Sequence, residues 1–91
     1  MPDDDVKRKV ELYLEKAAPL FDNIEFAAPP EKLDMEKVKH EFYEMALCYY
    51  KDARHFFGKR EYENALASLE YAEGWLDAGR RLGIFIIKKR E

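Results

Sequence analysis

The sequence predicts an all-α protein that forms a three-helix bundle-like domain, and three observations lead to that fold class. Apolar residues recur at helical spacing over three stretches of the chain. Residues suited to begin or end a helix, such as Asp34 and Gly83, lie at the margins of these stretches. With 91 residues and one cysteine, the chain is expected to form a single domain, residues 1–91, without an intramolecular disulfide.

A first helix is expected over about residues 3–18. Asp3, Asp4 and Asp5 suit its start, because carboxylates accept hydrogen bonds from the free N–H groups there. Pro19 is expected to end or kink the helix, and residues 22–33 are expected to form a long loop. Its apolar stripe consists of Val6, Val10, Tyr13, Leu14 and Ala17.

A second helix is expected over about residues 35–57, with Asp34 as its N-cap and Gly58 as its C-terminal stop. Its apolar face is unusually broad, and Tyr43 and Leu47 widen it further toward one flank. We therefore expect this helix to pack between two neighbours. The rest of the face consists of Met35, Val38, Phe42, Met45, Ala46, Tyr49, Tyr50, Ala53, Phe56 and Phe57.

A third helix is expected over about residues 61–82, with Gly83 just beyond its end. One apolar stripe is predicted to face the second helix and consists of Tyr62, Ala65, Leu66, Leu69, Ala72 and Leu76. A second stripe is predicted on the other side and consists of Ala67, Tyr71, Gly74, Trp75, Ala78 and Leu82. Either the first helix or another protein chain would have to cover this second stripe.

The apolar tail after the third helix, within residues 84–91, has two interpretations. Ile84–Ile87 either folds back on the bundle or pairs with another chain, because no partner strand is evident in the sequence. The candidate protein interface therefore consists of Tyr71, Trp75, Leu82, Ile84, Phe85, Ile86 and Ile87.

Charged residues make up 38% of the chain, whereas Thr and Gln are absent, a composition expected of a thermophile. The net charge is −3, but the C-terminal end is basic through Arg80, Arg81, Lys88, Lys89 and Arg90. These residues indicate either an ordinary solvated surface or a patch that binds RNA or an acidic partner. The lone Cys48 and the acidic N-terminus favour a cytoplasmic protein, and no apolar run is long enough to span a membrane.

Few residues suggest chemistry. Glu73, Asp77 and Arg80 interrupt the first stripe of the third helix, either as an Asp77–Arg80 ion pair or as a polar notch beside Trp75 that binds a ligand or partner side chain. Asp52 and His55 stand three residues apart, but the second such pair that a di-iron site requires is missing. No catalytic residue, cofactor or metal site is predicted, and enzyme activity has no positive support.

The stretch from Met45 to Phe85 resembles the archaeal family of short helical proteins known as domain of unknown function 357. The matching parts are Tyr50-x-Asp52-Ala53 with His55-Phe56, then Tyr62-x-x-Ala65, and Tyr71-Ala72-x-Gly74-x-Leu76-Asp77-Ala78 followed by Gly83. The resemblance implies an archaeal, cytoplasmic, all-helical protein and brings no catalytic or ligand residues. A weaker resemblance, to a single tetratricopeptide-like antiparallel hairpin, covers Tyr49, Ala53, Phe56, Tyr62, Ala65, Leu69 and Ala72.

Together these observations predict a non-enzymatic module that binds a protein partner or associates with itself. An RNA- or nucleic-acid-associated module using the basic end is the first alternative, and strong salt dependence of binding would distinguish it. A helical domain that binds a small molecule or metal near Asp52, His55 and Asp77 is the second.

Overall fold

The computed structural model describes residues 2–88, which form three α-helices: α1 (Pro2–Asp22), α2 (Met35–Gly58) and α3 (Tyr62–Arg81). These residues contain no β-strand, and the predicted all-α class is confirmed. The chain divides into two compact units, residues 1–31 and residues 32–91, and each is described by itself.

The first unit contains α1, which continues through Pro19 and ends at Asp22. The predicted end near residue 18 is therefore wrong. Proline has no N–H to donate to the carbonyl four residues earlier, so the last turn of α1 lacks that one backbone hydrogen bond. The Pro19 carbonyl accepts hydrogen bonds from the backbone N of Asn23 at 3.1 Å and from its Nδ2 at 2.6 Å, which closes the helix.

The second unit begins with the predicted N-cap of α2. Asp34 Oδ1 accepts hydrogen bonds from the backbone N of Glu36 at 3.0 Å and of Lys37 at 3.3 Å. Two of the N–H groups that a helix start leaves without a partner are thereby satisfied. The role of Asp34 is confirmed.

The C-terminus of α2 differs from the prediction, because Gly58 is the last helical residue and does not form the turn that stops the helix. Arg60 takes that place with a φ of 64°. Its N–H donates to the Phe57 carbonyl at 3.0 Å, and the N–H of Glu61 donates to the Phe56 carbonyl at 2.9 Å. This paired pattern normally has glycine at the left-handed position, so Arg60 holds a conformation that its side chain disfavours.

The C-terminus of α3 uses the same pattern with the expected residue. Gly83 has a φ of 76°, its N–H donates to the Arg80 carbonyl at 3.0 Å, and the N–H of Ile84 donates to the Gly79 carbonyl at 2.9 Å. The tail then turns back, and the ring of Phe85 lies directly on Gly79, where no Cβ would fit. Of the two interpretations of the tail, Phe85 follows the one in which it folds back.

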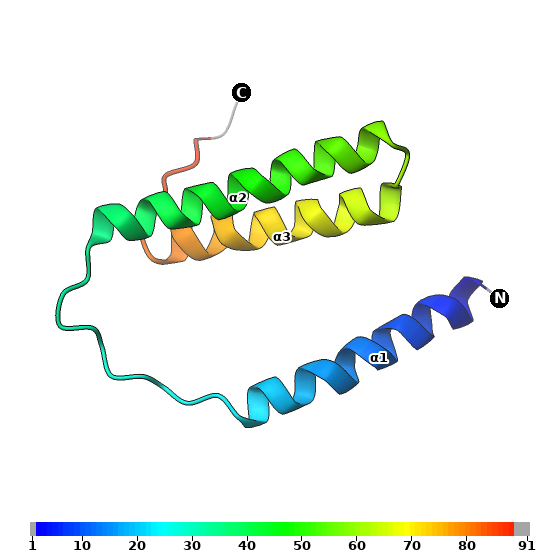
Figure 1. Ribbon diagram of the computed structural model, residues 1–91, viewed down its shortest axis with the longest axis horizontal. Helices are drawn as coiled ribbons and strands as arrows, with labels where there is room; N and C mark the ends of the chain where they lie inside the picture. Colours follow the sequence, from blue (N-terminus) through cyan, green and yellow to red (C-terminus); the bar gives the residue numbers. More distant parts are fainter. Residues whose placement is uncertain (1, 89–91) are drawn as a thin grey trace. The chain divides into compact units, whose positions relative to one another are not determined.

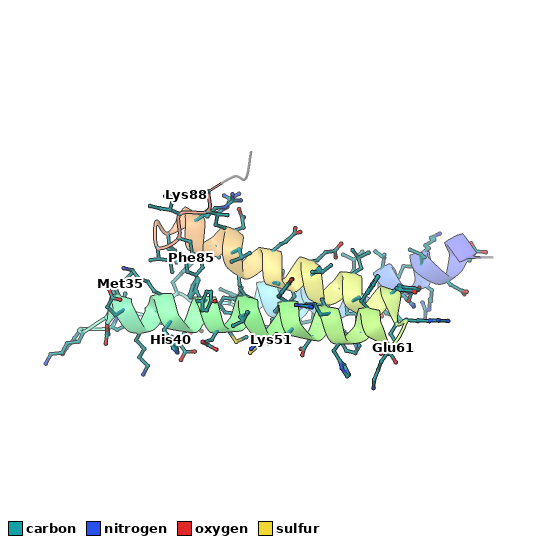
Figure 2. All side chains as sticks on the ribbon, turned by 90° about the horizontal axis from the view of Figure 1, so that it is seen from above. Met35, His40, Lys51, Glu61, Phe85 and Lys88 are labelled. Atoms are coloured by element: carbon teal, nitrogen blue, oxygen red, sulfur yellow. The ribbon has the colours of Figure 1, made fainter. Side chains whose placement is uncertain are left out.

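Helices α2 and α3 lie side by side and antiparallel, joined by a short turn (Figure 1). Met35 and Phe85 lie at one end of this hairpin, and Glu61 lies at the other (Figure 2). Small residues fill the line of closest approach, which we call the seam, namely Ala46, Ala53, Ala65, Ala72 and Gly79. No larger apolar side chain in the described part of the chain is equally buried, so the large residues all stand beside the seam.

Candidate functional site

Aromatic side chains close one side of the seam, which we call the closed side. The rings of Phe42 and Trp75 meet edge to face with centroids 5.1 Å apart, and those of Tyr49 and Tyr71 lie 4.3 Å apart. The prediction that Tyr71 and Trp75 face away from the second helix is therefore wrong. The buried residues Ala65, Ala72 and Gly79 recur every seven positions, so residues on both sides of that line reach α2. A shallow groove of ≈ 390 Å³ remains, lined by Tyr71, Gly74, Trp75 and Ala78.

The other side of the seam, which we call the open side, carries a groove in two adjoining halves that share Tyr50 and Leu69. The first half has a volume of ≈ 230 Å³ and a surface that is almost wholly apolar. The second half has a volume of ≈ 380 Å³ and lies toward the turn between the helices. Besides the shared pair, the first half is lined by Tyr43, Ala46, Leu47, Ala72, Glu73 and Leu76, and the second by Ala53, Arg54, Phe57, Gly58 and Ala65.

Large apolar side chains around this groove are exposed to an extent that a finished core does not show. Tyr43 is 52% exposed, Tyr50 47% and Phe57 66%. Two packed helices contact each other along one line. Apolar residues on either side of that line therefore need a further layer to cover them. The open side thus presents a long apolar surface with alanines at its floor.

The residues of the predicted polar notch line one hollow of ≈ 460 Å³ at the end of α3, together with Glu70, Gly74, Leu76 and Ile87. Asp77 Oδ1 accepts from Arg80 Nη2 at 3.2 Å, and Asp77 Oδ2 accepts from Arg81 Nε at 3.0 Å. The hydrogen bonds from Arg81 and Arg80 lower the pKa of the Asp77 carboxyl. Trp75 does not line this hollow, so the expected position of the notch beside Trp75 is wrong.

The predicted basic patch is only partly described, because Lys89 and Arg90 lie outside the described residues. Arg80 and Arg81 both pair with Asp77, which offsets part of their charge, while Lys88 is exposed. Of the remaining predicted interface residues, Leu82 is exposed, Ile84 is half-buried, and Ile86 is 88% exposed. Of the predicted interface residues, only Ile87 lines the same hollow as Glu73, Asp77 and Arg80.

Side chains suited to catalysis or metal binding are scattered. Within residues 2–88, no group of three or more His, Cys, Asp and Glu side chains is placed to hold a metal ion. His40 Nε2 lies 3.9 Å from Glu44 Oε1, whereas the His55 ring lies beside Phe56. Over the same range, no helix has both the length and the apolarity needed to cross a membrane.

The open side was not predicted as a site, although the sequence carried a signal for it. The apolar face of residues 35–57 is wider than one neighbour can cover, and Tyr43 and Leu47 lie on the widening flank. Leu69 was predicted to face the second helix, and it does so from the edge of the groove. Arg54 had no place in the apolar pattern, so only the structure brings it to the groove.

Residues 12–85 match the model of a family described as a protein of unknown function, DUF357. No curated protein and no solved structure matches the chain. The family match covers most of the sequence, including all of α2 and α3. The chain therefore belongs to the DUF357 family.

Proposed function

We propose that this member of the DUF357 family is a non-enzymatic helical module that acts by binding another polypeptide chain through the open side of its α2–α3 hairpin. One observation carries the proposal. Only alanines and a glycine are buried in the seam, whereas the large apolar residues of the open side surround an apolar groove. Residues 32–88 supply no layer over this apolar face, and an exposed apolar face of this kind marks an interaction surface.

The open side is better suited to a partner than the interface predicted from sequence. Tyr71 and Trp75 already have ring partners on α2, and Phe85 packs on Gly79. Trp75 and Phe85 are half-buried, so a partner that contacts them would gain less newly buried area than one that covers Tyr43, Tyr50 and Phe57, whereas Tyr71 is itself 58% exposed. Leu82 and Ile86 stay available as a lesser contact surface.

The nucleic-acid alternative has weaker support from the described residues. Asp77 accepts hydrogen bonds from both Arg80 and Arg81, so a phosphate would compete with a carboxylate that is already in place. Binding that falls steeply with salt and requires Arg80 and Arg81 would favour this alternative. Cytoplasmic location, archaeal origin and thermophily remain predictions from composition and resemblance.

Photo-crosslinking from two positions on α2 tests the proposal. A photoreactive residue replaces either Leu47, which lines the groove, or Lys51, which is exposed and lines neither half. Crosslinks to a defined polypeptide are expected from position 47 in native cells and not from position 51. Tyr50→Asp should abolish them, because a charge in the groove would be buried by the partner. Equal crosslinking from both positions, or none from either, contradicts the proposal.

A further inference from the structure

The two halves of the open groove carry charges of opposite sign. Arg54 lies in the half toward the turn and Glu73 in the half away from it, while Tyr50 and Leu69 belong to both. Neither Arg54 nor Glu73 has an ion-pair partner among the side chains that the structure describes, those of residues 4–88. The groove is thus an apolar strip with one unpaired charge on each side of a shared centre.

Within one chain these two charges are separated along the hairpin. Ala53 and Ala65 form the floor beside Arg54, whereas Ala46 and Ala72 form the floor beside Glu73. Seven residues separate the two alanines of each helix, which corresponds to about 10 Å along the axis. Arg54 and Glu73 therefore lie too far apart along the hairpin to pair with each other. Each can instead pair with a charged group on a second molecule.

We infer that the polypeptide bound on the open side is a second copy of this chain, packed face to face as a twofold-symmetric four-helix bundle; this inference rests on the proposed function. The twofold axis lies in the plane of the interface, perpendicular to the helices, and passes by Tyr50 and Leu69. That rotation brings Arg54 to the level of Glu73 of the partner subunit, and Glu73 to the level of Arg54 of the partner subunit. A twofold interface forms every such contact twice.

The charges also select one orientation of the two hairpins. Rotation about an axis parallel to the helices would keep each residue at the level of its own copy, so Arg54 would approach Arg54 of the partner subunit. Like charges in an interface are unfavourable, whereas the perpendicular axis pairs opposite charges. The apolar residues give the attraction, and Arg54 with Glu73 sets the direction.

The size of the groove sets the expected strength of the dimer. From Tyr43 to Phe57 the groove follows about four helical turns, or about 21 Å. An interface of this length buries less than the roughly 800 Å² of surface per partner that a standard complex buries. We therefore expect a reversible dimer with a Kd in the micromolar range.

Charge reversal on the full chain tests the inference by analytical ultracentrifugation across nanomolar to high micromolar concentration. Arg54→Glu and Glu73→Arg should each weaken self-association by at least about tenfold, because each variant places two like pairs in the interface. An equimolar mixture of the two variants should dimerise as the wild type does, because every pair then has opposite signs. Lys51→Glu, the same charge reversal three residues from Arg54 but outside the groove, should leave the wild-type Kd unchanged.

Three results overturn the inference: a wild-type chain that stays monomeric throughout, single variants that associate as the wild type does, or a mixture that associates no better than its components. Circular dichroism checks folding, and both exposed positions should tolerate the changes. If the chain is monomeric but position 47 still crosslinks to a different protein, the second copy is wrong and the proposed function stands. If the chain is monomeric and position 47 forms no crosslink, both the inference and the proposed function are wrong.

Discussion

The two sides of the α2–α3 seam start from similar material and end differently. On the closed side, Phe42 meets Trp75 and Tyr49 meets Tyr71, so each ring has a partner across the seam, and of these four only Tyr71 is more than half exposed. On the open side, Tyr43 and Tyr50 stand around a groove and remain about half exposed. A two-helix hairpin can thus pair large rings across its seam on one side, while the other side still requires a further layer.

Removal of one ring from each side tests directly whether the two sides differ in packing. Trp75→Ala should lower the free energy of unfolding by about 2–4 kcal/mol, because a half-buried ring is lost. Tyr50→Ala should cost less than about 1 kcal/mol in the monomer, because Tyr50 is 47% exposed. Urea denaturation at a concentration that keeps the chain monomeric measures both. Equal losses would show that the two sides do not differ in packing.

A change at Gly79 tests whether the end of the seam is as tightly closed as its middle. Gly79→Ala should lower the free energy of unfolding by about 1–2 kcal/mol, since the new Cβ would displace the Phe85 ring. In a Phe85→Ala background the same change should become stabilising, because alanine favours helix by about 1 kcal/mol. Denaturation of the four chains gives the coupling between the two positions. Additive effects would contradict the packing of Phe85 on Gly79.

The helix ends provide a test that alters neither side. Arg60→Gly should raise the free energy of unfolding by about 1 kcal/mol, because glycine holds the left-handed conformation without strain. Gly83→Ala should lower it by a similar amount, as the matched opposite change at the other helix end. Thermal melts followed by circular dichroism are sufficient. A decrease for Arg60→Gly would mean that the arginine side chain contributes more than its backbone strain costs.

The smallest effect is expected at Asp77, in the polar hollow at the end of α3. Arg81 and Arg80 lower the pKa of Asp77 in the folded chain, so its carboxylate stabilises the fold above its unfolded pKa near 3.8. That contribution should fade as the pH falls through the lower, folded pKa. Asp77→Asn should therefore reduce Tm slightly at neutral pH and not below both pKa values. High salt should shrink the difference, because the ion pairs are exposed. A salt-independent loss would indicate another role for Asp77.

Sequence reasoning succeeded where one residue and its neighbours decide the outcome. The N-cap at Asp34 and the left-handed glycine at Gly83 are local preferences of the backbone, and both were predicted. It failed at Pro19, through which α1 continues to Asp22, and at the stop of α2, where Arg60 rather than Gly58 takes the left-handed position. Hydrogen bonds from Asn23 close α1, and hydrogen bonds around Arg60 close α2.

The all-α class, the residues that are apolar at helical spacing and membership of the DUF357 family all follow from the sequence alone. Only the tertiary structure decided which residues lie in the seam and therefore which side is closed. Periodicity gives the angle of a residue around its own helix, but not the angle at which the neighbouring helix approaches. The seam lies a fraction of a turn away from the predicted line. Trp75 therefore contacts Phe42, and Tyr50 and Leu69 lie at the centre of an open groove.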